Sequence, residues 1–208
     1  MIRGELAIRS FDVVKRTCIL KYYKLFRSTL HWSANQVRQF QAEKLKDIIR
    51  YAYENSQFYR QRFEANNITP DQIRKPDDLN RIPPLTRLEL QEYLEDIKTK
   101  NNFHLKSSSS GTTGIPVVYY LDADGYSAGV AAGYFQWSLA GWEPGQRGIH
   151  VWGNPQSQKK WKTKGSKIKQ MFYNQKYFPA SDLNFRSRIT GFFEVCNSFR
   201  PDYIDGYS

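Results

Sequence analysis

The sequence predicts a mixed α/β protein in which a helical first part, residues 1–100, precedes the beginning of an α/β domain, residues 101–208. Two observations support this division. In the first part, apolar residues recur at helical spacing behind recognisable helix-start signals. In the second part, short runs rich in β-branched and aromatic residues alternate with helical segments, which is the pattern typical of an α/β arrangement.

Helix-start signals order the first part of the chain. Residues 33–36 and 86–89 fit capping boxes, and 69–72 has proline at the first helical position. The helix that begins at residues 86–89 is expected to extend to about residue 97. The basic segment 11–30 is expected to be a surface helix packed on the protein, and the alternative is a helix lying on a membrane surface. The first capped helix should bury one face, formed by Val37, Phe40, Leu45, Ile48, Ile49 and Ala52.

Four strands are expected in the second part, with helices between them. The glycine- and alanine-rich segment 123–139 predicts a helix that can pack closely on a sheet, and a further helix is expected to begin at Ser181. The predicted strands are residues 103–107, 116–121, 148–153 and 202–206.

The most informative segment is residues 107–116, which reads S-S-S-S-G-T-T-G-I-P directly before a predicted strand. Small residues let backbone N–H groups turn toward a ligand, and Ser and Thr add hydroxyl donors, so such a loop can wrap a polyphosphate. No Gly-Lys-Ser/Thr follows, so the loop is not of the Walker type. On residue types alone, a phosphate loop and a structural turn or linker remain open.

Residues 109–116 resemble the S-S-G-T-T-G-x-P loop of adenylate-forming enzymes, the superfamily of acyl-CoA synthetases and luciferases. Many members carry Lys after the proline. This chain has Val117, as is common in the branch of the phenylacetate–CoA ligases and the CapK-type capsular-polysaccharide proteins. Gln57 departs from that branch, which usually has proline there. Four flanking segments are similar to the branch: Y-A-Y-E-N-S-Q-F-Y-R at 51–60, I-P-P-L-T-R at 82–87, G-W-E-P-G-Q-R and W-G within 141–153, and R-P-D-Y-I-D-G-Y at 200–207.

The resemblance implies an ATP-dependent ligase that activates a small-molecule carboxylic acid as acyl-AMP and transfers it to CoA, with Mg²⁺ as a further cofactor. Its catalytic residues are expected beyond Ser208, so the chain is expected to be an N-terminal fragment without ligase activity of its own. Arg147, or the lysines of residues 159–176, could supply the positive charge of the missing loop lysine. The residues implied to contact the ATP phosphates are Ser109, Ser110, Gly111, Thr112, Thr113 and Gly114.

The acyl pocket has weaker candidates, which are His150, Trp152 and Gly153 in a predicted strand. Core packing is the alternative for His150 and Trp152. Two other function classes stay open. One is a capsular or cell-surface polysaccharide biosynthesis protein of the same fold with a different acceptor, and the other is a basic binding module without catalysis.

The net charge of +11 is high, and seven lysines without any acidic residue lie from Lys159 to Lys176. Such a run is usually a solvated helix face or a loop, and we expect it to be poorly ordered. The alternative is a patch that meets anionic substrate, cofactor phosphates or a membrane surface. No nucleic-acid motif accompanies the run, so nucleic acid is not an expected partner.

Other sequence features bound the location and the chemistry. The two cysteines favour a reducing compartment over a disulfide framework. The chain has no signal peptide and no apolar stretch long enough to span a bilayer, so a cytoplasmic location is expected. The three histidines have no metal-ligand spacing, so no metal site is expected among them.

Overall fold

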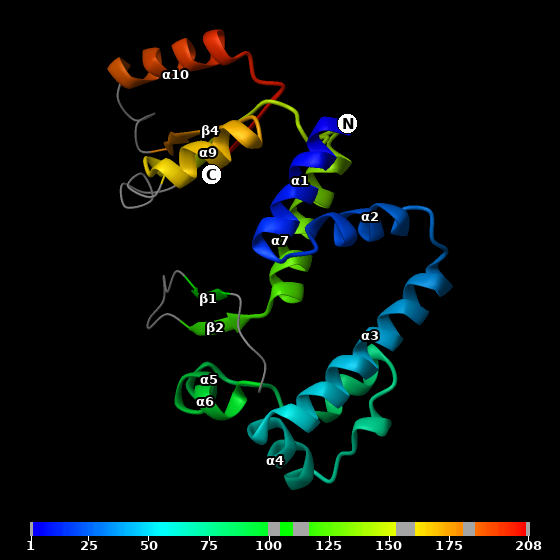
Figure 1. Cartoon of the computed structure of the whole chain (residues 1–208). Helices are drawn as coiled ribbons and strands as arrows, with labels where there is room; N and C mark the ends of the chain where they lie inside the picture. The colour runs from blue at the N-terminus through cyan, green and yellow to red at the C-terminus, as the bar shows by residue number, and fades with distance from the viewer. Residues whose placement is uncertain (1, 100–104, 110–116, 153–160, 181–185, 207–208) are drawn as a thin grey trace. The chain divides into compact units, whose positions relative to one another are not determined.

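A computed structural model describes residues 2–99, 105–109, 117–152, 161–180 and 186–206 (Figure 1). The chain divides into two compact units, and each is described here by itself. One unit comprises Lys24–Gly129 and the other comprises Met1–Tyr23 with Val130–Ser208. The division falls inside two helices, α2 (Ile19–Thr29) and α7 (Ala123–Leu139).

The unit 24–129 is built mainly from helices in its first part. The long helix α3 (Ala34–Asn55) begins with the predicted capping box of Ser33 and Gln36. Ser56 ends α3 and caps α4, because its hydroxyl accepts a hydrogen bond from the Tyr59 N–H. The further elements are α4 (Gln57–Ala65), the 3₁₀ turns η1 (Pro70–Gln72) and η2 (Pro76–Arg81), α5 (Arg87–Glu92) and α6 (Leu94–Ile97).

The core of this unit lies between α3, α4 and the turns that follow. Phe63 of α4 is almost completely buried and stacks on Tyr53 of α3, with 5.9 Å between the ring centroids. Ile49 is buried as the helical spacing predicts, whereas its neighbour Ile48 is exposed. The buried members of the cluster are Ile49, Phe63, Ile68 and Ile73.

Two of the predicted helices are shorter than expected. The signal at residues 69–72 begins only the 3₁₀ turn η1, although its capping box is present. The capping box of Thr86 and Glu89 is also present, but the helix behind it is interrupted at Tyr93 and continues as the short α6. Local start signals therefore identify where these elements begin but not how far they extend.

Arg62 of α4 ties the start of α5 to the helical part of this unit. Its guanidinium donates to the carbonyl oxygens of Pro83 at 3.0 Å and Pro84 at 2.6 Å, and pairs with the Glu89 carboxylate at 2.8 Å. Glu89 also accepts from the N–H and the hydroxyl of Thr86, both at 2.8 Å. The hydrogen bond from Arg62, followed by those from Thr86, lowers the pKa of Glu89 from 4.5 to about 2.

Glu89→Gln should therefore destabilise the chain in a pH-dependent way. The folded carboxyl has a pKa of about 2 and the unfolded one about 4.5, so its stabilisation is fully present above pH 4.5. The stabilisation is lost as the pH falls toward 2. Urea unfolding of the wild type and the variant across this range should show a difference that disappears on acidification. Glu43→Gln, which changes an exposed carboxylate of α3, is the matched control.

The β-structure of the same unit is one antiparallel hairpin. Strand β1 (Leu105–Ser108) pairs with β2 (Val118–Leu121), with Leu105 opposite Leu121 and Ser108 opposite Val118. This agrees with the prediction that residues 103–107 and 116–121 are partner strands. The hairpin places the Ser/Thr/Gly segment in the connection between its two strands.

The second unit contains α1 (Ile2–Lys15), the start of α2, the end of α7 and a small parallel sheet. The sheet has the order β4-β3-β5, with β3 in the centre. Its strands are β3 (Gly148–Trp152), β4 (Gln175–Pro179) and β5 (Tyr203–Gly206), and the connecting helices are α9 (Lys164–Phe172) and α10 (Arg186–Phe199). Strand–helix–strand connections are the expected way to join parallel neighbours.

The strand β4 and the helix α9 correct the expectation for residues 159–176. The lysine-rich run was expected to be poorly ordered, and that expectation is wrong for residues 161–176, which contain α9 and the start of β4. Residues 159 and 160 lie outside the described residues. No strand was predicted at β4, because Gln175 and Lys176 conceal the apolar alternation on which strand prediction relies.

Candidate functional site

The Ser/Thr/Gly segment is closed at its base by two hydrogen bonds between the strand ends. The Ser109 N–H donates to the Val117 carbonyl at 2.9 Å, and the Val117 N–H donates to the Ser109 hydroxyl oxygen at 3.0 Å. The hairpin therefore holds both ends of the connection together. Accepting the second bond does not use the hydroxyl hydrogen of Ser109, which can still be donated.

The other predicted phosphate contacts are Ser110, Gly111, Thr112, Thr113 and Gly114, and they lie outside the described residues. Their role stays a prediction. Val117, which directly follows the Ser/Thr/Gly segment, is joined to Ser109 through its backbone. The structure thus defines the frame of the loop and leaves its ligand contacts to experiment.

A polar row crosses one face of the parallel sheet in the other unit. His150 on the central strand lies between Tyr177 of β4 and Asp205 of β5, which are its register partners on either side. His150 is 5% exposed. The Asp205 carboxylate lies against its Nδ1, an arrangement that is an ion pair when the imidazole is protonated. The carboxyl ends of parallel strands are the edge at which α/β folds bind ligands.

Aromatic rings surround this histidine. Tyr177 stacks on His150 with 5.1 Å between ring centroids, and Trp137 of α7 and Tyr203 of β5 lie at 5.6 Å and 5.9 Å. Trp161 in turn stacks on Tyr177 at 5.0 Å. On this face of the sheet, the imidazole of His150 is therefore surrounded by aromatic rings.

Burial affects two tyrosines beside His150. Desolvation raises the pKa of Tyr177 and of Tyr203, with a smaller contribution from the Asp205 charge. Like any tyrosine whose pKa is not lowered, both carry a hydroxyl hydrogen at neutral pH and can donate it. Within the described part of the chain, no group hydrogen-bonds the buried Nε2 of His150.

The predicted pocket residues have different surroundings. Trp152 lies on the same face of β3 as His150, two residues along, but is 48% exposed. Gly153 lies outside the described residues. The sequence could not indicate the partners Tyr177 and Asp205, because the register of three strands brings them to His150 from distant positions.

Gly148 is required for the packing of this face. A side chain there would collide with the ring of Tyr203, its register partner on β5. Gly148→Ala should therefore displace Tyr203 and destabilise the chain by about 1 kcal/mol or more. Gly133→Ala in α7, where nothing lies within 4 Å of the added methyl group, should be neutral or stabilising in the same denaturant titration. Equal effects of the two substitutions would contradict this packing.

Arg147 is already engaged and is a poor substitute for the missing loop lysine. Its guanidinium pairs with Asp202 at 3.2 Å, and its backbone N–H donates to the same carboxylate at 2.8 Å. These hydrogen bonds from Arg147 lower the pKa of Asp202. The pair joins the start of β3 to the start of β5, at the edge opposite the strand ends that lie near Trp152.

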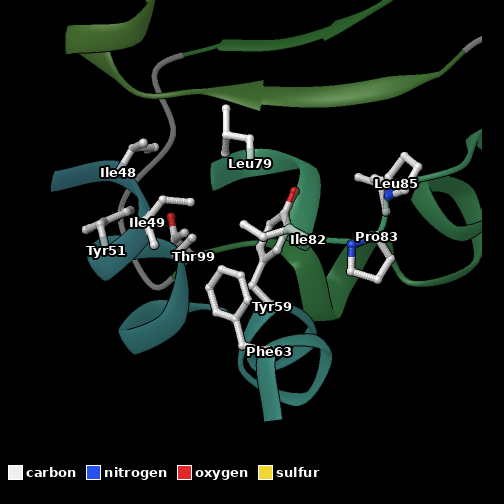
Figure 2. A pocket seen from close by; sticks show the side chains of 12 residues that line it. Ile48, Ile49, Tyr51, Tyr59, Phe63, Leu79, Ile82, Pro83, Leu85 and Thr99 are labelled. Carbon is white, nitrogen blue, oxygen red and sulfur yellow. The ribbon is translucent and has the colours of Figure 1, made fainter. Parts of the chain in front are cut away.

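Sequence reasoning missed an apolar cavity of about 440 Å³ in the unit 24–129. Figure 2 shows Ile48 and Ile49 of α3, Tyr59 and Phe63 of α4, and Leu79 of η2 around it (Figure 2). Burial raises the pKa of Tyr59, so its hydroxyl stays protonated. The cavity suits an apolar group rather than phosphate, because carbon atoms form most of its lining.

Neither a metal-binding group of side chains nor a membrane-spanning helix is found among the described residues. Among them, no group of three or more His, Cys, Asp or Glu side chains could hold a metal ion. None of the helices in the described ranges combines the length and the apolar character that crossing a bilayer requires.

Comparison with known proteins gives relatives in both sequence and structure. No family model matches the chain. It is 25% identical over 182 residues to Protein CapK of Staphylococcus aureus, covering 84% of this chain and 38% of CapK. It is 32% identical over 92 residues to the phenylacetate-coenzyme A ligase of Escherichia coli strain K12, covering 41% of this chain and 20% of the ligase.

A solved 2-hydroxyisobutyryl-CoA ligase, in complex with 2-HIB-AMP and CoA, has a similar fold with a TM-score of 0.57. The two chains are 19% identical, and the similarity covers 83% of this chain and 37% of the ligase. This chain therefore spans between a fifth and two fifths of the length of these relatives. The predicted α/β fold class is confirmed, and the chain is related in sequence and in fold to the adenylate-forming ligase superfamily.

Proposed function

We propose that the chain supplies the ATP-phosphate loop and part of the acid-binding side of an ATP-dependent, adenylate-forming ligase. In this proposal, residues 101–208 are the first part of the adenylation domain and residues 1–100 precede it. The observation that carries the proposal is the S-S-G-T-T-G-I-P segment between two paired strands, within a chain whose fold is similar to part of a CoA ligase.

The reaction is a displacement at phosphorus followed by a transfer to sulfur. A carboxylate oxygen attacks the α-phosphate of ATP, the bond to the β-phosphate oxygen breaks, and pyrophosphate leaves with the bonding pair. A thiol of CoA then attacks the acyl carbon, and AMP leaves. Negative charge moves onto pyrophosphate only in the first step, so donors aimed at the phosphates accelerate that step.

The loop residues are suited to this task by their chemistry. Ser109, Ser110, Thr112 and Thr113 bring hydroxyl donors, and Gly111 and Gly114 allow a close approach of the backbone. The hydrogen bonds between Ser109 and Val117 hold the two ends of this segment together. In this proposal, the chain contributes these hydroxyl and backbone donors to the leaving pyrophosphate.

We place the acid near His150 and Trp152. Three observations support this placement: the carboxyl end of a parallel strand, the aromatic walls, and a buried Nε2 without a partner. Asp205 favours the hydrogen on Nδ1, so Nε2 donates to the carboxylate of the acid only when the imidazole is protonated. Gly153 joins this assignment as a prediction only.

A second candidate function keeps the adenylation step but uses another acceptor. The similarity to CapK covers 84% of this chain, whereas that to phenylacetate-CoA ligase covers 41%. This difference in coverage favours a CapK-like member of the branch over a dedicated phenylacetate–CoA ligase. In that function the acceptor differs and the loop chemistry stays the same.

The experiment uses the ligase that contains this chain, incubated with ATP and a panel of aryl and acyl acids. Mass spectrometry detects the acyl-AMP and any thioester, with CoA present or omitted. Acyl-AMP that is converted to a CoA thioester supports the first function. Acyl-AMP that persists beside CoA supports another acceptor, and the absence of acyl-AMP with every acid would refute both.

A further inference from the structure

The helix α9 presents its apolar side to the outside. Ile168 is 63% exposed, Met171 76% and Phe172 49%, and their spacing places them on one side of the helix. A surface helix of a globular protein normally turns such a stripe toward the core. We call these three residues the α9 stripe.

Polar residues occupy the side of α9 opposite the stripe. The side-chain amide of Gln170 donates to the Trp161 carbonyl at 3.1 Å and to the Ser166 hydroxyl at 3.2 Å. Ser166 and Gln170 are both half-buried, unlike the residues of the stripe. The helix is therefore inverted, with half-buried polar side chains on one side and exposed apolar ones on the other. Figure 1 shows where α9 lies in the chain.

Cationic side chains flank the α9 stripe. Lys162, Lys164 and Lys167 are exposed, and no acidic residue occurs from Lys159 to Lys176. A hollow of about 330 Å³ lies beside the stripe and has two lysines in its lining. Its lining residues are Lys167, Gln170, Met171, Asn174, Gln175, Lys176 and Phe199.

We propose that α9 docks on the surface of an anionic lipid bilayer. The α9 stripe enters the boundary between headgroups and acyl chains, and the lysines neutralise headgroup phosphates. The hollow holds one headgroup, whose phosphate meets Lys167 and Lys176 while Asn174 supplies a further polar contact. This interaction is independent of the ligase chemistry.

The combination of charge and apolar exposure selects this partner. A nucleic acid would meet the lysines but would leave Ile168, Met171 and Phe172 in water, because its backbone has no apolar phase. An acidic protein would need its own apolar groove to cover the same three residues. A bilayer with anionic headgroups satisfies both parts of the surface at once.

The test is flotation of the 208-residue chain with vesicles of phosphatidylglycerol and phosphatidylcholine, beside vesicles of phosphatidylcholine alone. We expect binding to the anionic vesicles only, with an affinity that falls as salt is raised. The triple variant Lys162→Gln, Lys164→Gln, Lys167→Gln should lose roughly a hundredfold in affinity. Ile168→Ser with Met171→Ser should lose roughly tenfold or more, because two exposed apolar side chains no longer insert.

The matched control removes three exposed lysines elsewhere: Lys44→Gln, Lys46→Gln, Lys75→Gln. It loses the same net charge and should retain most of the binding. Equal losses in the two triple variants would show attraction by net charge alone and would overturn the proposal. Binding that survives loss of Ile168 and Met171, or an absence of vesicle binding by the wild type, would also overturn it. In the last case, another class of partner covers the stripe.

Discussion

Replacing Thr112 or Thr113 by Ala should slow acyl-adenylate formation by roughly a hundredfold to a thousandfold. Loss of one preorganised donor to a developing negative charge typically costs about 2.7–4 kcal/mol of transition-state stabilisation. Thioester formation from a preformed adenylate should change far less, because pyrophosphate has already left. The effect is therefore expected in one half-reaction only.

Pyrophosphate exchange measures the first half-reaction, and single-turnover thioesterification of a supplied acyl-adenylate measures the second. Ser108→Ala is the matched control, since this exposed hydroxyl belongs to strand β1 and is not among the predicted phosphate contacts. It should leave both rates close to those of the wild type. Equal losses in both half-reactions for the two threonine variants would contradict the assignment of the loop to the ATP phosphates.

Asp205→Ala should destabilise the chain by about 3 kcal/mol, near the upper end of the cost of leaving a buried polar group without its partner. His150 is 5% exposed, and its Nδ1 lies against this carboxylate. The double variant His150→Leu with Asp205→Ala should be less destabilised than the sum of the single variants, because the unpaired imidazole is gone. Urea unfolding followed by tryptophan fluorescence measures all three free energies.

Asp202→Ala provides the comparison for this pair. Asp202 is the other carboxylate near β5, and it pairs with Arg147 in a part-exposed position. Solvent screens an exposed ion pair, so this substitution should cost less than Asp205→Ala. Strict additivity of the His150 and Asp205 substitutions would show that the two side chains are not coupled.

Much of the fold could be predicted from local signals. The capping boxes at Ser33 and Thr86 are present, and the helix Ala123–Leu139 has the predicted limits. Strands were also expected at residues 103–107 and 116–121, which overlap β1 and β2. These features depend on residues that are close to one another in the sequence, so they can be predicted from it.

What could not be predicted depends on contacts between distant residues or on the absence of contacts. The strand β4 owes its conformation to pairing with β3, since Gln175 and Lys176 have little preference for a strand. Asp205 meets His150 only through the register of β3 and β5. The outward orientation of the apolar side of α9 could not be predicted either. Helical spacing shows that a helix has an apolar side, but it does not show whether that side faces the core or the solvent.

The position of the candidate site was predicted in part. The loop 107–116 stood out from its residue types, and the structure adds the hydrogen bonds that close it at Ser109 and Val117. His150 was a candidate through its place in a predicted strand, but its aromatic walls come from a helix and two other strands. The apolar cavity beside Phe63 left no local pattern from which it could be inferred.

The most direct measurement of the central claim is exchange of labelled pyrophosphate into ATP by the ligase that contains this chain, with and without a carboxylic acid. The proposed function predicts exchange that requires the acid, that does not require CoA, and that falls by roughly a hundredfold or more in Thr113→Ala. Exchange that does not depend on the acid, or that is unchanged in Thr113→Ala, would contradict the claim that this loop serves acyl-adenylate formation.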